Sequence, residues 1–294
     1  MTEAPPVRSG IACVVDRLAT GLRELGDEVD VVTTADVGRF EFGEVRLTGL
    51  ARHWPALRRR LAKYDVVHLH GPAPTFSDAF LTLWHTLPRH RRPALVYTHH
   101  SDIALPAAKP LCFLYNSIHR RLVRAANAVV VSTPSYRTSF EPFGPENVEV
   151  VPFGVEPNGH LPRRNGERLT VAFCGQLRPY KGVDVLIRAA AELPDVQFEI
   201  AGDGHQAAEL HELADALGLK NVVFHGRISD EDRDLLLHRA DVVALPSTTR
   251  AEAFGIVVLE GMAAGAVPIA SNLDGVRDVA GRSGLLVTPG HVRS

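Results

Sequence analysis

The chain alternates short apolar runs with longer stretches in which apolar residues recur at helical spacing. Short apolar runs bounded by glycine, proline or polar residues are typical of strands that are buried on both faces of a parallel sheet. They predict strands at residues 28–33, 40–50, 65–70, 94–99, 128–132, 148–151, 169–174, 197–201, 222–225, 241–245, 267–270 and 284–287. The helical periodicity predicts helices at residues 11–25, 57–63, 78–87, 111–126, 183–191, 206–217, 230–238 and 253–264.

A break in this alternation divides the chain. Residues 152–166 hold three prolines and three glycines and show no apolar periodicity, which is typical of a linker. On both sides of the break strands alternate with helices, and this order predicts largely parallel, doubly wound sheets. We therefore expect two Rossmann-like α/β domains, residues 1–157 and residues 158–294, that face each other across the linker.

The segment 246–265 carries the strongest candidate chemistry. A short polar turn ends at Glu252, and the helix that follows is apolar on nearly every side yet contains Glu260. A buried carboxylate costs several kcal/mol unless a partner satisfies it. One interpretation is that an arginine or backbone amides satisfy Glu260. The other is that both carboxylates face one polar ligand, since eight helical residues advance about 12 Å with a rotation of about 80°.

In an open α/β sheet ligands collect at the carboxyl ends of the strands, so the segments that follow strands are the candidate sites. The segment GQLRPYKG (175–182) joins a predicted strand to the N-terminus of a helix, where free backbone N–H groups favour an anion. Arg178 and Lys181 add charge suited to phosphate. The segment lacks the GxxxxGK[ST] spacing, so it is not the P-loop of a nucleoside triphosphatase.

Other polar segments give weaker signals. The stretch 202–207 matches GxGxxA and suggests a dinucleotide site, but the next strand does not end in the acidic residue expected to bind an adenosine ribose. Asp230 and Asp232 form a DxD, which we interpret as the first turn of a helix capped by Ser229. The pairs 68/70 and 99/100 are histidines, but no nearby carboxylate or cysteine completes a site, so we expect no structural metal.

Composition limits the classes of function. The net charge of −2 gives no case for a nucleic-acid partner. Three scattered cysteines without a CxxC pattern suit a reducing compartment, and the N-terminus lacks the pattern of a signal peptide, so we expect a cytoplasmic protein. The run Arg52–Lys63 contains five basic residues and no acid. A solvated helix face is the simpler interpretation, and the alternative is peripheral contact with anionic lipid at the inner face of a membrane.

Taken together, these segments resemble glycosyltransferase family 4, whose members are retaining nucleotide-sugar transferases with the GT-B fold. The resemblance extends from about residue 5 to residue 290. Its most specific part is the E-x7-E motif formed by Glu252, AFGIVVL and Glu260. Supporting segments are GQLRPYKGVDVLI, AGDG, NLDGV, HHSDI, VSTPSY and the N-terminal SGIACVVDRLATGLRELGDEVDVVTT.

The resemblance implies a role for each matching residue. Glu260 would hold the ribose hydroxyls of the donor, Glu252 would contact the transferred sugar, and Lys181 would bind the diphosphate. His100 would reach the sugar from the first domain, and Gly10 would let the backbone approach a phosphate. We therefore expect Glu252, His100 and Lys181 to act in catalysis. The expected donor-binding residues are Gly10, Gln176, Arg178, Lys181, Gly202, Arg227, Ile228, Phe254, Gly255 and Glu260.

The family pattern also predicts the reaction. It is the retaining transfer of a sugar from a UDP- or GDP-sugar to a hydroxyl acceptor, in glycan, glycolipid or glycoconjugate biosynthesis. The acceptor would be a glycan, a lipid-linked molecule or a small molecule. We expect no metal and no cofactor, since fixed cations and helix N-termini can stabilise the charge on the leaving diphosphate.

The chain departs from the family pattern at several positions. Gln176 stands where the family usually has arginine, and Ser9 precedes Gly10 where the family has a second glycine. We also expect the chain to lack the family's first strand and its C-terminal helices. These departures favour a second hypothesis, a catalytically weak or inactive GT-B-like binding protein or partner subunit. A dinucleotide-dependent oxidoreductase is a third hypothesis, favoured only by the GxGxxA match.

Overall fold

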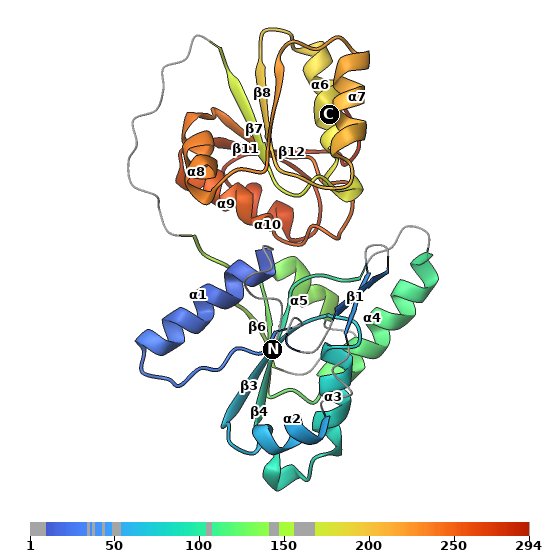
Figure 1. The fold of residues 1–294 in the computed structure, drawn as a ribbon, viewed down its shortest axis with the longest axis vertical. Coiled ribbons are helices and arrows are strands. Elements are labelled where there is room, and N and C mark those ends of the chain that lie inside the picture. Colours follow the sequence, from blue (N-terminus) through green and yellow to red (C-terminus); the bar gives the residue numbers. More distant parts are fainter. Residues whose placement is uncertain are drawn as a thin grey trace. The chain divides into compact units, whose positions relative to one another are not determined.

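The computed structural model describes residues 10–33, 36, 39–42, 45–48, 54–103, 108–140, 147–155 and 168–293 (Figure 1). The chain divides into two compact units, Met1–Phe153 (unit 1) and Gly154–Ser294 (unit 2). Each unit contains its own parallel sheet with helices packed against it. The expected domain boundary between residues 157 and 158 lies outside the described residues.

Unit 2 contains a six-stranded sheet in the order β12-β11-β10-β7-β8-β9, and every neighbouring pair is parallel. Its strands are β7 (Thr170–Cys174), β8 (Gln197–Ala201), β9 (Val222–Gly226), β10 (Val242–Leu245), β11 (Val267–Ser271) and β12 (Leu285–Val287). Its helices are the 3-10 turn η5 (Pro179–Lys181), α6 (Val183–Glu192), α7 (Ala207–Ala216), α8 (Asp230–Arg239), α9 (Ile256–Ala263) and α10 (Val276–Ala280). The six strands predicted for this half of the sequence are confirmed.

The core of unit 2 lies on both faces of its sheet. Side chains alternate along β7, so Val171 and Phe173 pack in the apolar cluster that includes α6 and α7. Ala172 and Cys174 point to the other face and pack with Leu237 of α8. Helices therefore cover the sheet on both sides (Figure 1). This arrangement explains why the central strands β7 and β10 are nearly continuous apolar runs in the sequence.

Unit 1 contains a four-stranded parallel sheet in the order β3-β4-β5-β6 and a separate antiparallel hairpin of β1 and β2. The strands are β1 (Arg39–Phe42), β2 (Val45–Thr48), β3 (Val66–Gly71), β4 (Ala94–His99), β5 (Ala128–Val131) and β6 (Val148–Val150). The helices are α1 (Gly10–Glu24), α2 (Trp54–Leu61), α3 (Ser77–Thr86), the 3-10 turn η3 (Arg89–Arg91), α4 (Lys109–Val123) and α5 (Pro134–Phe140). The predicted turn at Gly43 lies outside the described residues.

The strand predicted at residues 28–33 is wrong. Residues 28–32 have no regular secondary structure, and Thr33 forms only an isolated bridge. Side chains bind the backbone groups that a neighbouring strand would otherwise bind. The Arg23 guanidinium donates to the carbonyl of Val29 at 2.8 Å, and the Asp36 carboxylate accepts from the Thr33 N–H at 2.7 Å. Within the described part of the chain no strand pairs with residues 28–32, and an alternating pattern needs such a neighbour to form a strand.

Other differences concern short helices. The helix predicted to follow Glu252 directly begins only at Ile256, because Gly255 adopts a left-handed conformation (φ 78°) that cannot continue into a helix and so marks its start. The helices α5 and α10 were not predicted. They have seven and five residues, so neither is long enough to show a clear periodicity.

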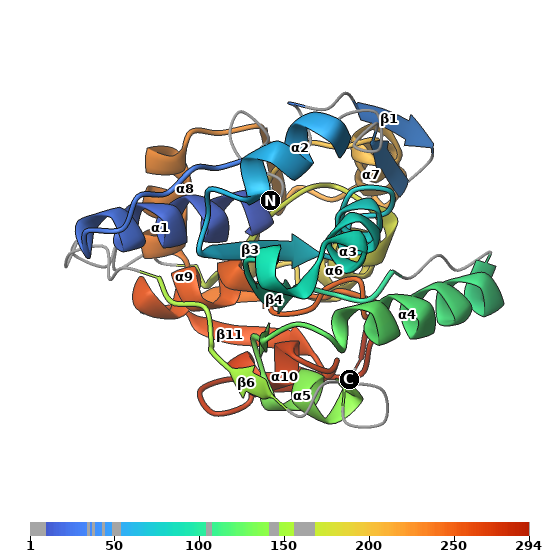
Figure 2. The same cartoon turned by 90° about the horizontal axis from the view of Figure 1, so that it is seen from below.

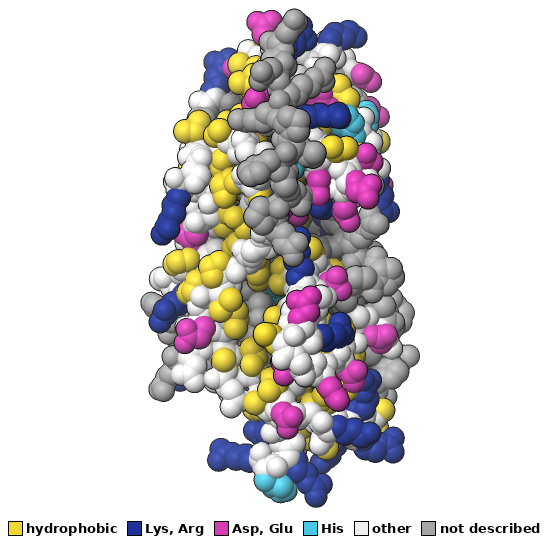
Figure 3. Space-filling model, turned by 90° about the vertical axis from the view of Figure 1, so that its left-hand side faces the viewer, with side chains coloured by type: hydrophobic (Ala, Val, Ile, Leu, Met, Phe, Trp, Pro, Cys, Tyr) yellow, Lys and Arg dark blue, Asp and Glu magenta, His cyan; other side chains and the backbone are white. Residues whose placement is uncertain are grey.

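The basic run of the sequence falls on α2. Arg58, Arg59 and Lys63 are exposed, whereas Arg60 lies 3.7 Å from Asp30 and donates to Tyr64. Arg52 lies outside the described residues. On the side of the molecule shown in Figure 3, Lys and Arg side chains gather at the lower tip, and acidic and basic side chains mix elsewhere. None of the described helices is both long and apolar enough to cross a bilayer.

Candidate active site

The loops of unit 2 converge where the strand order reverses. Strands β7 and β10 are neighbours, with Val171 beside Val242. From β7 the chain continues outward to β8 and β9, whereas from β10 it continues the opposite way to β11 and β12. The loops that follow β7 and β10 therefore meet at the carboxyl edge of the sheet, the position at which open α/β sheets bind ligands. A hydrogen bond from the Thr248 N–H to the Tyr180 carbonyl, 2.7 Å long, joins these two loops.

An ion pair lies at this meeting point. The Lys181 ammonium is 2.5 Å from the carboxylate of Glu252, and the two side chains are 14% and 12% exposed. Burial lowers the pKa of Lys181, but the nearby Glu252 carboxylate outweighs this effect and holds that pKa above its usual value. The Ser247 hydroxyl also donates to Glu252, at 3.4 Å. The lysine is therefore charged at neutral pH and oriented by the carboxylate.

Glycines let the loop of Lys181 pack closely. Gly182 has a φ of 66°, and a Cβ at this position would lie 2.2 Å from the carbonyl oxygen of Pro246. At Gly202 a Cβ would lie 1.8 Å from the carbonyl oxygen of Gly175. The Lys181 ammonium lies 3.9 Å from the position of a Cβ at Gly175. Glycine is thus required where the backbones after β7, β8 and β10 approach one another.

The turn that carries Glu252 leads directly into α9. Phe254 and Gly255 are buried, and Gly255 forms the N-cap of the helix without a side-chain hydrogen bond. The free N–H groups of the first helical turn point out of the N-terminus, where they favour negative charge. Arg250, in the same turn, lies 2.5 Å from Asp274 in the segment after β11. This contact ties the turn to the next loop along the sheet edge.

Glu260 lies on α9, where it faces Arg233 of α8. Its carboxylate is 16% exposed and 3.7 Å from the Arg233 guanidinium, longer than a hydrogen bond. Arg233 also contacts Asp230 at 3.1 Å and Asp234 at 3.2 Å. Burial lowers the pKa of Arg233, but Glu260 and Asp234 outweigh it and raise that pKa above its usual value. An arginine therefore lies near Glu260, as the first of the two interpretations of the sequence requires. Nothing in the spacing of the sequence identifies that arginine as Arg233.

The remaining expected residues of unit 2 lie along the same edge in different environments. Gln176 and Arg227 are exposed, and Arg178 is half-buried. Gly202 donates its N–H to the carbonyl of Gly226 at 2.8 Å, which joins the loops after β8 and β9. The side chain of Ile228 packs against the apolar cluster on the α8 side of the sheet, so it contributes to the core.

Gly10 and His100 belong to unit 1. Gly10 is the first residue of α1 and is exposed. His100 follows β4, is 6% exposed and lies 3.0 Å from the Nδ1 of His70 through its Nε2. Burial lowers the pKa of His100 to about 3 and that of His68 to about 4, so both rings are neutral at pH 7. His68 and His70 stack at 4.4 Å between ring centroids.

His99, beside this cluster, belongs to a second network. It lies 3.2 Å from Asp102, and the Arg120 guanidinium contacts both oxygens of that carboxylate at 2.7 Å. Burial raises the pKa of Asp102, but His99 and Arg120 outweigh this effect and lower it to about 2. The described residues contain no group of three or more side chains placed to hold a metal ion. At the DxD sequence, the Ser229 hydroxyl accepts from the Asp232 N–H at 3.0 Å, which confirms the predicted helix cap.

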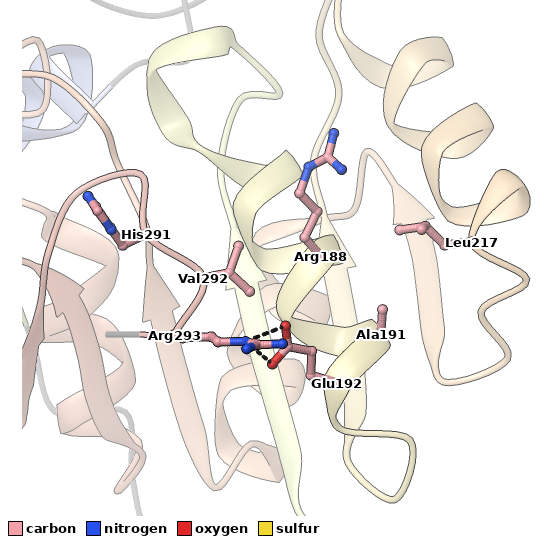
Figure 4. Close-up of a pocket in the computed structure, with 7 residues that line it drawn as sticks. All are labelled: Arg188, Ala191, Glu192, Leu217, His291, Val292 and Arg293. Carbon is pink, nitrogen blue, oxygen red and sulfur yellow. Dashed lines mark hydrogen bonds and ion pairs between the residues drawn. The ribbon is translucent and has the colours of Figure 1, made fainter.

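Unit 2 also has a shallow hollow away from these residues (Figure 4). It is lined by the second half of α6, by Leu217 at the end of α7 and by residues 291–293, and Arg293 binds Glu192 across it at 3.0 Å. The second half of α6 lies toward the amino edge of the sheet, opposite Lys181 and Glu252. The hollow is therefore separate from the candidate active site.

Comparisons with known proteins agree with this arrangement. The family model of Glycosyltransferase Family 4 matches residues 8–158, and the model of Glycosyl transferases group 1 matches residues 162–294. The D-rhamnosyltransferase WbpZ of Pseudomonas aeruginosa is 33% identical over 79% of the chain and 62% of its own length. A phosphatidyl-myo-inositol mannosyltransferase of Mycobacterium tuberculosis is 31% identical over 86% of the chain and 65% of its own length. The chain thus spans less than two thirds of these relatives.

Solved structures give the fold. A structure of Anabaena HepE in complex with UDP and glucose matches 93% of the chain and 76% of its own chain, with a TM-score of 0.68 and 25% identity. Sucrose-phosphate synthase from Thermosynechococcus elongatus matches 99% of the chain and 82% of its own, with a TM-score of 0.76 and 20% identity. With its two α/β units and parallel sheets, the chain has the GT-B fold, as the resemblance implied.

Proposed function

Because the chain belongs to glycosyltransferase family 4, we propose that it transfers a sugar from a UDP- or GDP-sugar to a hydroxyl acceptor. The observation that carries this proposal is the Lys181–Glu252 pair at the strand-order reversal of unit 2. It supplies a fixed cation and a carboxylate at the edge where such sheets bind nucleotides. The two relatives described above are named as a rhamnosyltransferase and a mannosyltransferase, which supports a hexose donor.

Lys181 would serve the leaving group. When the bond between the anomeric carbon and the diphosphate breaks, negative charge develops on the departing oxygen. The Lys181 ammonium, held charged by Glu252, would stabilise that charge without reorganisation. The N–H groups at the start of α9 would add a second electropositive contact. We therefore propose a metal-independent reaction.

Glu252 would hold the transferred sugar. Its carboxylate accepts from Lys181 and Ser247, so it has lone pairs left for the sugar hydroxyls. A charge-assisted bond to a hydroxyl orients the sugar ring toward the acceptor. The backbone of Phe254 and Gly255, at the entrance to α9, would line the same position.

Glu260 would bind the ribose. Its carboxylate is 16% exposed and lies 3.7 Å from the Arg233 guanidinium, whose positive charge orients it. Two ribose hydroxyls can donate to the two oxygens of one carboxylate. Arg178 would add charge at the diphosphate, beside Gln176 and Gly202, and the segment of Arg227 and Ile228 would lie along the base.

The transfer would retain the anomeric configuration. Glu252 is committed to Lys181, and a carboxylate neutralised in this way is a weak nucleophile. We therefore assign no covalent intermediate to the protein. The acceptor would attack from the face of the leaving group, and a diphosphate oxygen would take its proton. Neutral His100 would donate a hydrogen bond to the sugar, and Gly10 would let the backbone approach a phosphate.

The three cysteines are free, which suits the reducing cytoplasm where we place the reaction.

A donor screen tests the proposal. The full chain is incubated with UDP- and GDP-sugars and a hydroxyl acceptor, and free nucleoside diphosphate and product are measured by mass spectrometry. We expect release from one donor class with the anomeric configuration kept. Inversion of configuration would refute the retaining step, and stabilisation against heat by NAD but by neither UDP nor GDP would refute the transferase proposal.

A second candidate function is a catalytically weak binding protein. It is favoured by Gln176, an exposed amide where the family usually has an arginine at the phosphate loop. Such a protein would bind UDP or GDP yet release no diphosphate from any donor sugar. If the missing charge at this position is what prevents turnover, Gln176→Arg should produce measurable release of diphosphate where the wild type shows none.

A further inference from the structure

One face of the strand pair β3 and β4 carries a row of polar side chains. In the parallel register of these strands His68 lies beside Val96, and His70 lies beside Thr98; Figures 1 and 2 both show the two strands side by side. Side chains alternate between the two faces of a sheet, so the even-numbered residues of both strands point to one face. His100, directly after β4, continues this face.

Each histidine of β3 contacts the residue two places beyond its register partner. Nε2 of His68 lies 2.7 Å from the Thr98 hydroxyl oxygen, and Nδ1 of His70 lies 3.0 Å from Nε2 of His100. The His100 N–H donates to the carbonyl of Gly71 at 2.8 Å, which extends the hydrogen bonding of the sheet by one residue. His100 is therefore fixed through its backbone and through one ring nitrogen.

Ring stacking holds the same side chains. The ring centroids of His68 and His70 are 4.4 Å apart with 18° between the planes, and those of His70 and His100 are 5.2 Å apart with 23°. Phe153, which follows β6, stacks on His100 at 5.6 Å with 26° between the planes. Because His70 and His100 are also buried, contacts with two rings restrict the rotation of the His100 imidazole.

The contact between His70 and His100 holds a single hydrogen. Burial lowers the pKa of His70 well below its usual value and that of His100 to about 3, so both rings are neutral at pH 7. A neutral imidazole donates through one nitrogen and accepts through the other. If His70 donates, the hydrogen of His100 lies on Nδ1, whereas if His100 donates, its Nδ1 is an acceptor.

We propose that His70 is a positioning residue for His100, whose Nε2 accepts from the Nδ1–H of His70 and whose own hydrogen therefore lies on Nδ1. This role rests on the proposed function, in which His100 donates a hydrogen bond to the transferred sugar. Since Nε2 of His100 faces His70, the donor to the sugar is Nδ1–H. His70 selects this tautomer and fixes the ring plane before the sugar binds, so binding requires no reorganisation of the imidazole.

Nuclear magnetic resonance of the imidazole nitrogens tests the tautomer without any sugar. The full chain is labelled with nitrogen-15 in its histidines, and two-bond correlations between ring protons and ring nitrogens are recorded at about pH 7.5. The signals are assigned by their loss in His70→Asn and in His100→Gln. We expect the hydrogen on Nδ1 in both rings. A hydrogen on Nε2 of His100 would overturn the proposal.

Turnover separates a positioning role from a merely structural one. His70→Leu removes the donor, and we expect kcat to fall by about tenfold to hundredfold, while KM for the donor sugar changes by about threefold or less because unit 2 supplies the nucleotide contacts. His70→Asn places an amide N–H near the position of Nδ1 and should keep kcat within about threefold of the wild type.

His68→Leu is the matched control. It removes a histidine from the same strand and the same face, but one whose ring bonds to Thr98 rather than to His100. Its kcat should stay within about threefold of the wild type. Urea unfolding followed by tryptophan fluorescence should show similar losses of stability in His68→Leu and His70→Leu, because each leaves one polar partner unpaired. If His70→Leu does not fold, the tautomer of the wild type and His70→Asn decide.

A double variant shows whether His70 acts through His100. In His100→Gln/His70→Leu, kcat should equal that of His100→Gln, since no imidazole is left to position. A further fall by the full factor seen in His70→Leu, or a His70→Leu chain as active as His68→Leu, would overturn the proposal.

The positioning role and the transferase activity can fail separately. A chain that releases diphosphate from no donor refutes the transferase, and the spectrum still decides the tautomer of His100. A chain that transfers a sugar while its His100 carries the hydrogen on Nε2 refutes only the role of His70.

Discussion

The interaction free energy of Lys181 and Glu252 can be measured by a double-mutant cycle. Lys181→Met and Glu252→Gln each remove one charge with little change in shape. At 2.5 Å the Coulomb attraction is about 7 kcal/mol for an effective dielectric constant of about 20, and desolvation of two mostly buried groups offsets much of it. Each single variant leaves an uncompensated charge, which should cost about 2–4 kcal/mol of the free energy of unfolding.

The double variant should recover most of that loss. It leaves neither charge, so we expect the free energy of unfolding to return to within about 1 kcal/mol of the wild type, and a coupling energy of about 2–3 kcal/mol. Arg293→Gln is the control, because the Arg293–Glu192 pair of the same unit is 83% and 44% exposed. Breaking an exposed pair should change stability by about 0.5 kcal/mol or less.

Urea unfolding provides the assay. Trp54 and Trp84 are the two tryptophans of the chain, and both lie in unit 1. Their fluorescence therefore reports unit 1, whereas far-ultraviolet circular dichroism reports both units. The circular dichroism transition should shift for the single variants, and the fluorescence transition should not. A coupling energy below about 0.5 kcal/mol would refute the reasoning, because the two side chains would then not form the close pair described here.

Three further predictions concern the close glycine contact, the ribose-binding carboxylate and the buried histidines. Gly182→Ala should cost about 2–4 kcal/mol in urea unfolding, whereas Gly218→Ala, at nearly the same φ but with open space around it, should cost only about 1 kcal/mol. Glu260→Ala should weaken UDP or GDP binding about tenfold to hundredfold by calorimetry, with stability changed by about 1 kcal/mol or less, since Arg233 keeps its aspartates. The pKa values of His68 and His100 are about 4 and about 3 in the folded chain but about 6.5 when unfolded, so the unfolded state binds more protons at acidic pH. Burial lowers the pKa of His70 and of His99 as well, so each buried histidine adds to the same effect. The free energy of unfolding should therefore fall between about pH 7.5 and about pH 5.5, by about 1.4 kcal/mol each for His68 and His100, and the fall should be smaller by about that amount in His100→Gln.

The sequence was most informative where burial dominates. The central strands β7 and β10 are buried on both faces, so each is a nearly continuous apolar run that can be recognised without a structure. Their alternation with helices then fixes the parallel topology and places the loops after β7 and β10 at one edge. This is why Lys181 and Glu252, which are 71 residues apart, were both expected at the site.

Side-chain pairs that form only through tertiary packing could not be predicted from the sequence. The pairing of Glu260 with Arg233 depends on how α8 and α9 cross, which no local pattern specifies. The contact of His70 with His100 depends on the register of β3 against β4. The failed strand at residues 28–33 has the same cause, because strand formation depends on a neighbour that the local pattern does not contain.

Titration calorimetry with UDP and GDP tests the central claim most directly, namely that Lys181 and Glu252 form the donor site. At least one of the two nucleotides should bind the full chain, and Lys181→Met should weaken its affinity by about tenfold or more through loss of a charge-assisted contact to the diphosphate. Arg293→Gln should bind like the wild type. Failure of both nucleotides to bind, or equal affinity in the wild type and Lys181→Met, would contradict the account.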